Sequence, residues 1–267
     1  MAYSTLPRDI GLLYRYREVV INLVQADLKL RYRRTLLGYT WALLYPLATL
    51  AIMTMVFAKA MGYEHWQSYV LFVFSGLLPW NFLISAMWGA GYSIVFHEDL
   101  LKKIYLPKHL FPLAVTMARF ADFLFNFVVL FLIIGPIVHY QPSWSLLGLP
   151  LAILILLVFM TGVAFAIATL NVYVRDTTHL MSVIMQLGFY LTPIIYKANS
   201  DKVSAKFRFI FEINPMTHIV RPFQDIISDG VFPSPDRFGA AIGVALATFL
   251  IGYAIYSTLQ RELIFRL

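Results

Sequence analysis

Four polar side chains lie inside one long apolar segment, residues 110–138, at spacings that place them on a single helical face. They are Thr116, Arg119, Asp122 and Asn126, separated by three, three and four positions. Ionisable groups at membrane depth are costly and usually face a bundle interior or a watery cavity, where they pair. Arg119 and Asp122 are therefore expected to pair, either within a transport path or gate or as a static structural ion pair.

Aromatic side chains suggest a second kind of chemistry, the stacking of rings on the apolar faces of sugars. The chain has 22 Phe, 16 Tyr and 5 Trp, and some of these residues fit the belt that membrane proteins place at the bilayer surface. Tyr39, Trp41, Trp88 and Tyr92 lie within or near apolar segments and are the candidates for lining a substrate channel. Core packing is the alternative explanation for them.

A charged segment, residues 97–109, could contact a cytoplasmic partner. It reads HEDLLKKIYLPKH, and it contains Glu98, Asp99, Lys102 and Lys103. The lysines place the segment on the cytoplasmic side. A short helix before the proline and a plain connecting loop are both consistent with it.

The elements that must position these residues are membrane-spanning helices. Of the 267 residues 60% are hydrophobic and 13% are charged, and the mean hydropathy is +0.73. About 20 apolar residues are enough to cross a bilayer. We therefore predict an all-α membrane protein with a single transmembrane domain over residues 1–267. Its six predicted spans cover residues 36–61, 69–96, 110–138, 146–170, 180–196 and 238–259.

Two further elements are expected at the membrane surfaces. Residues 15–34 carry one polar stripe opposite an apolar face that Asp27 interrupts, which predicts an amphipathic helix lying in the headgroup plane. Residues 200–228 contain two stretches too short to span, which are expected to be short re-entrant helices. Basic residues before the first span place the N-terminus inside, and six spans return the C-terminus to the same side.

Several classes of function are disfavoured by what the sequence lacks. A third of the Lys and Arg residues precede the first span, so the net charge of +7 needs no nucleic acid to explain it. There is no cysteine, no phosphate-binding loop and no H-E-x-x-H motif, so nucleotide binding of the P-loop type, metal chemistry and enzymatic activity are not expected.

Taken in order, these segments make the chain resemble the membrane subunit of ABC-2 type transporters, specifically permeases that export polysaccharides such as O-antigen, capsule or teichoic acid. The resemblance covers nearly the whole length. It is carried by these segments: LKLRYRRTLLGYTWALLYPLATLAIMTMVF, FSGLLPWNF, NVYVRDTTH, LTPIIY and INPMTHIVRPFQ.

The resemblance implies a homodimer in a bacterial cytoplasmic (inner) membrane, with two separate ATPase subunits that bind ATP and Mg and no cofactor in this chain. Residues 15–34 would be an interface helix and residues 97–109 would couple to the ATPase. The short helices within residues 200–228 would form an external gate. The implied cargo is a lipid-linked glycan.

Three alternative functions remain for this chain. They are an ABC-2 permease for a drug or small lipid, an intramembrane enzyme acting on lipid-linked sugars through Glu64 and His65, and a channel that needs no ATPase.

Overall fold

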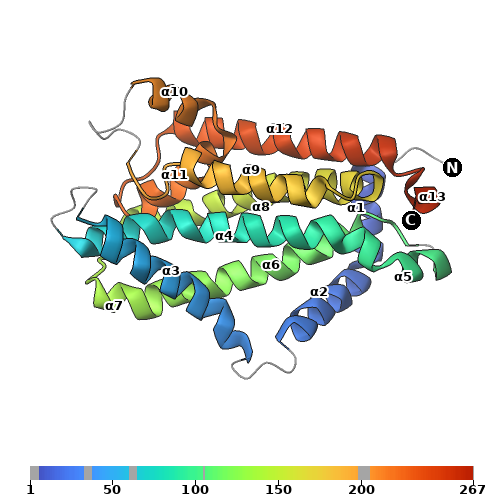
Figure 1. Ribbon diagram of the computed structural model, residues 1–267, viewed down its shortest axis with the longest axis horizontal. Coiled ribbons are helices and arrows are strands. Elements are labelled where there is room, and N and C mark those ends of the chain that lie inside the picture. The colour runs from blue at the N-terminus through green and yellow to red at the C-terminus, as the bar shows by residue number, and fades with distance from the viewer. Residues whose placement is uncertain (1–5, 33–37, 60–64, 105, 198–204, 267) are drawn as a thin grey trace.

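The computed structural model describes residues 6–32, 38–59, 65–104, 106–197 and 205–266, and every regular element in these ranges is helical. Figure 1 shows the arrangement, in which long helices run side by side along the longest axis of the molecule. The elements are α1 (Leu6–Arg15), α2 (Arg17–Tyr32), η1 (Gly38–Thr40), α3 (Trp41–Phe57), α4 (Trp66–Phe96), α5 (Glu98–Lys103), α6 (Leu110–Val129), η2 (Leu130–Ile134), α7 (Gly135–Ile137), η3 (Trp144–Gly148), α8 (Leu149–Tyr173), α9 (Thr177–Leu191), α10 (Ala205–Ile213), α11 (Pro215–Ile227), α12 (Pro235–Leu259) and α13 (Leu263–Arg266).

Four helical segments within the described ranges are long and apolar enough to cross a membrane. They are Trp66–Phe96, Leu110–Ile137, Trp144–Tyr173 and Pro235–Leu259. The all-helical membrane fold expected from the sequence is thereby confirmed in outline. The predicted first span corresponds to the shorter apolar helix α3, and the predicted fifth span corresponds to the 15-residue helix α9. The count of six spans therefore remains a prediction.

Helix α4 forms the centre of the bundle. Trp80, Leu83 and Ala86 are almost wholly buried, and the apolar core extends from them into α6, α8 and α11. Apolar side chains alone do not bring helices together in lipid, so close packing must come from shape. The glycines of α4 supply that shape.

Gly76, Gly89 and Gly91 of α4 let neighbouring helices approach closely. A Cβ atom added at Gly91 would lie 2.4 Å from Thr178 Cγ2 of α9, and one at Gly89 would lie 2.5 Å from Val115 Cγ1 of α6. At Gly76 it would lie 2.9 Å from the amide nitrogen of Gln224 in α11. Each glycine therefore admits a different neighbouring helix.

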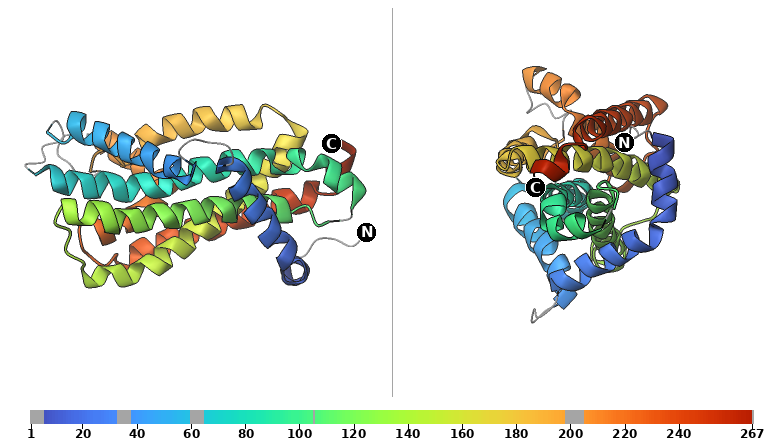
Figure 2. Two further views of the ribbon diagram at one scale, coloured as in Figure 1. Left: turned by 90° about the horizontal axis from the view of Figure 1, so that it is seen from below. Right: turned by 90° about the vertical axis from the view of Figure 1, so that its right-hand side faces the viewer.

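Helices α1 and α2 lie outside the bundle of long helices, and α2 packs against α6 (Figure 2). Helix α2 covers most of the segment, residues 15–34, where an amphipathic helix was predicted, and α1 precedes that segment. Figure 1 places α5 and both chain termini at one end of the bundle and α10 and α11 at the other. The charged segment and the two short helices thus lie toward opposite ends of α4 (Figure 1).

Candidate functional site

The polar face of α6 meets α2 in a cluster of four charged side chains. Arg31 of α2 donates to Asp27 Oδ2 at 2.7 Å and also to Asp122 of α6. Arg119 of α6 lies 3.4 Å from the same oxygen of Asp27. The side chains of Arg119 and Asp122 are only 14% and 12% exposed. Two acids and two bases compensate one another, as charges at this depth require.

The sequence placed Arg119 and Asp122 on one helical face and predicted that they pair with each other, whereas the structure pairs each of them with a residue of α2. Arg119 contacts Asp27, and Asp122 contacts Arg31, so both ion pairs join two helices. The available signal was Asp27 itself, an acidic residue on the apolar face of an amphipathic segment. Burial raises the pKa of the Asp27 carboxyl above its ordinary value, while neighbouring Arg31 acts in the opposite direction.

A cavity of about 350 Å³ lies beside this four-residue cluster, between α2, α3, α4 and α6. Polar side chains from three helices line part of it, and two aromatic residues of α3 lie among them. The lining includes Arg31, Trp41, Tyr45, Asn81, Ser85, Arg119, Asp122 and Asn126. Among the residues that the structure describes, Nε of Arg119 and Oδ1 of Asn126 are buried there without a hydrogen-bond partner. Both atoms belong to residues that line the cavity.

The four aromatic candidates fall in two places. Trp41 lines the cavity, whereas Trp88 and Tyr92 stack on each other on α4, with ring centroids 6.3 Å apart. Thr178 of α9 donates to the hydroxyl of Tyr92 at 3.0 Å. The side chain of Tyr39, like residue Glu64, lies outside the described part of the chain. The structure thus places Trp41 with the polar residues and the Trp88–Tyr92 pair against α9.

The charged segment forms the short helix α5, which is held by one apolar side chain. Leu101 is 7% exposed and packs in an apolar cluster with Phe111 and Tyr256. On the other side, Lys102 forms an i, i+4 ion pair with Glu98. Asp99, Lys102 and Lys103 are exposed. The helix is therefore anchored in the bundle while its charges remain available for contact.

At the opposite end, polar side chains tie α11 to the end of α9 and its following turn. Asn214 caps α11 by accepting from the Met216 backbone amide at 3.0 Å, and it donates to the Leu191 carbonyl at 2.9 Å. Gln224 donates to the Pro193 carbonyl at 2.8 Å. The LTPIIY and INPMTHIVRPFQ segments that stood out in the sequence are thus in direct contact.

Long apolar helices that enclose compensated charges and a polar cavity define a multi-pass membrane protein of the transporter class. Residues 18–227 match the family model described as ABC-2 type transporter. The chain belongs to this family, as the resemblance had predicted. The matched range contains every residue of the four-residue cluster and of the cavity beside it.

Relatives match over nearly the whole chain. The O-antigen export system permease protein RfbA of Myxococcus xanthus is 28% identical over 250 residues, which cover 94% of this chain and 95% of that protein. A Klebsiella pneumoniae protein of the same name is 29% identical over 255 residues, with the same shares covered. The polysialic acid transport protein KpsM of Escherichia coli is 20% identical over 241 residues, 89% of this chain and 92% of that protein.

Proposed function

We propose that this chain is the membrane-spanning permease subunit of an ABC transporter that exports a lipid-linked polysaccharide across a bacterial cytoplasmic membrane. The observation that carries the proposal is the match, over 94% of the chain, to relatives named as O-antigen export permeases. A match of this extent includes the cavity, α5 and the short helices α10 and α11, so it is not confined to one shared segment.

In this proposal the chain crosses the membrane six times and has both termini in the cytoplasm. The end of the bundle that carries α5 and the termini is then cytoplasmic, and α10 and α11 lie at the external face as gate helices (Figure 1). Leu101 anchors α5, and Glu98, Asp99, Lys102 and Lys103 contact a separate ATPase. ATP and Mg are bound by that partner, and two copies of it serve one transporter.

A second copy of the chain completes the conduit. Helix α9 supports this part of the proposal because large apolar side chains along its length, among them Leu180, Val183 and Leu187, are 57–60% exposed. In a membrane such a face contacts either lipid or another helix. Trp41 and the Trp88–Tyr92 pair remain the candidates for contacts with the glycan, together with Tyr39.

Reconstitution tests the proposal directly. The chain and its ATPase, placed together in vesicles, should hydrolyse ATP and move a lipid-linked glycan across the bilayer. A drug substrate or a short-chain lipid lacking the glycan should not move. Transport of those compounds without glycan movement would contradict polysaccharide export and favour the small-cargo alternative. Glycan movement without ATP would instead indicate a channel.

The coupling role of α5 leads to a separate prediction. Replacing Glu98 and Asp99 by alanine should lower export about tenfold, the effect of losing about 1.4 kcal/mol at a protein contact. The variant should still insert and fold, since Leu101 remains to anchor the helix. Export and ATP hydrolysis are measured together, and hydrolysis should continue while transport falls.

The matched control for that variant is Asp236→Ala. Asp236 is also an exposed carboxylate in the first turn of a helix, but it lies at the other end of the molecule. This control should transport normally. Equal export by the Glu98→Ala, Asp99→Ala double variant and the wild type would remove α5 from the coupling mechanism.

A further inference from the structure

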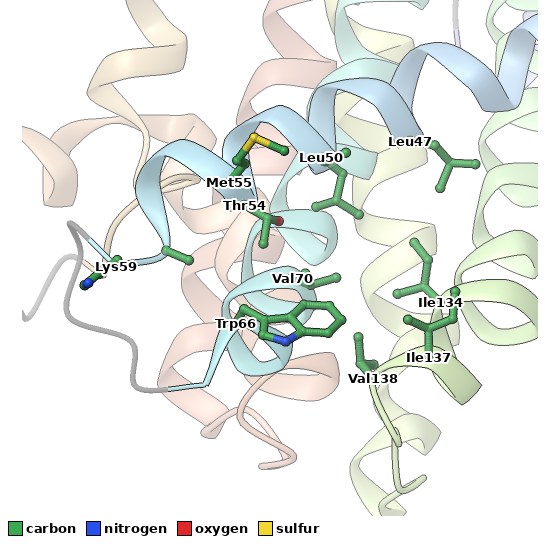
Figure 3. A pocket seen from close by; sticks show the side chains of 12 residues that line it. Leu47, Leu50, Thr54, Met55, Lys59, Trp66, Val70, Ile134, Ile137 and Val138 are labelled. Atoms are coloured by element: carbon green, nitrogen blue, oxygen red, sulfur yellow. The ribbon is translucent and has the colours of Figure 1, made fainter.

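A second and larger cavity, of about 950 Å³, forms a groove between α3, α4 and the stretch from the end of η2 through α7 to Val138. Figure 3 shows its side chains, with Leu47 and Lys59 toward opposite ends and Trp66 directed toward Ile137 and Val138. The lining is Leu47, Leu50, Ala51, Thr54, Met55, Ala58, Lys59, Trp66, Val70, Ile134, Ile137 and Val138. The groove shares no lining residue with the polar cavity described above.

The groove has the size and wall chemistry of a ligand site. Pockets that bind small molecules commonly measure about 300–1,000 Å³ and are mostly apolar. One wall includes Ile134, the last residue of a π-helical turn, Leu130–Ile134, inside an otherwise α-helical segment. Such turns are rare and frequently mark functional sites. The geometry of this wall therefore differs from that of an ordinary helix face in contact with the bilayer.

The polar atoms of the groove are few. Lys59 provides the one charge among the twelve lining side chains, and it follows the last turn of α3. Trp66 begins α4. Lys and Trp at the ends of apolar helices are typical of the zone where headgroups meet hydrocarbon. Thr54 lies about one turn earlier in α3, and its Oγ1 is buried with no hydrogen-bond partner among the described residues.

We propose that this groove binds a bilayer phospholipid of net negative charge, with its acyl chains against the apolar wall and its phosphate at Lys59. Two occupants could cover such a groove, a membrane lipid or a second copy of this chain, and the charge of Lys59 favours the lipid. A lone cation without a carboxylate among the lining residues complements a phosphate group, whereas a second copy of this chain would need to supply an acid to the same position.

Quenching of tryptophan fluorescence tests the site on the full chain. The protein is placed in phosphatidylcholine vesicles containing increasing fractions of phosphatidylglycerol with brominated acyl chains, which quench tryptophan on contact. The chain has five tryptophans, so the difference between wild type and Trp66→Phe isolates the signal from Trp66. Brominated phosphatidylcholine provides the reference for a lipid that lacks net charge.

We expect Trp66 to be quenched at an about fivefold lower fraction of brominated phosphatidylglycerol than of brominated phosphatidylcholine, as one cation near an anionic lipid predicts. Lys59→Gln should abolish this preference and Lys59→Arg should retain it. Equal quenching by both lipids in the wild type would overturn the proposal, because it would show unselective contact with the bilayer.

Absence of Trp66 quenching would also overturn it, and a cysteine variant then identifies the other occupant. The chain contains no native cysteine, so Met55→Cys, at a lining residue that is 86% exposed, introduces a single thiol into the groove. Disulfide-linked dimers of this variant would show that a second copy covers the groove. Phospholipid binding predicts instead that this thiol forms no disulfide between copies and that the quenching is selective, whatever dimer forms elsewhere on the chain.

Discussion

Replacing Gly252 by alanine should prevent the chain from folding normally. A Cβ atom at this position would lie 1.9 Å from the carbonyl oxygen of Gly162, where α12 crosses α8. Both atoms in conflict are fixed to helical backbones, so no side-chain rotation relieves the clash. Overpacking commonly costs about 1–3 kcal/mol and occasionally more, and a backbone conflict belongs at the upper end of that range. Yield in the membrane and the midpoint of thermal unfolding in detergent should both fall.

The matched control is Gly243→Ala in the same helix. A Cβ atom at Gly243 meets no other atom within 4 Å, and alanine is favoured over glycine in a helix interior by about 0.8–1.0 kcal/mol. This control should unfold at the same temperature as the wild type or at a higher one. Equal midpoints for the Gly252→Ala variant and the wild type would show that α8 and α12 do not cross as closely as described.

Local sequence signals predicted the long helices well because length and hydropathy are properties of a single segment. The second span was predicted as residues 69–96, and α4 covers Trp66–Phe96. The first span was predicted as residues 36–61, and α3 covers Trp41–Phe57 after the 3-10 turn Gly38–Thr40, in which Gly38 has a positive φ of 51°. The π-helical turn Leu130–Ile134 could not be predicted from the sequence, because apolar periodicity does not distinguish it from α-helix.

Contacts between helices were less predictable, since they depend on which faces meet. The close crossing of Gly162 and Gly252, for example, was not predicted. These two residues lie 90 positions apart in unrelated segments. The candidate site was likewise predictable within one helix but not between helices. Arg119 and Asp122 were recognised from spacing within one helix, whereas Arg31 became their neighbour only once α2 was placed against α6.

The link between α2 and α6 should be measurable as an interaction energy. Arg31→Gln and Asp122→Asn each leave a partly buried charge without its partner across the helix contact, whereas the double variant removes both charges. We expect the two substitutions to be non-additive in the free energy of unfolding, with a coupling of about 1–3 kcal/mol, as found for residues in one charge network. Unfolding in mixed micelles of the four proteins in this cycle supplies the measurement.

The exposed pair on α5 provides the comparison for that cycle. Glu98 and Lys102 also form an ion pair, but 34% and 51% of their side chains remain accessible and both belong to one helix. Water screens such a pair, so the coupling between Glu98→Gln and Lys102→Gln should be about 0.3–0.5 kcal/mol. If the Arg31–Asp122 coupling is no larger than this, the cluster contributes little to holding α2 on α6. A larger coupling makes α2 a helix fixed to the bundle by charge, so any partner that moves α2 must also move α6 and the polar cavity.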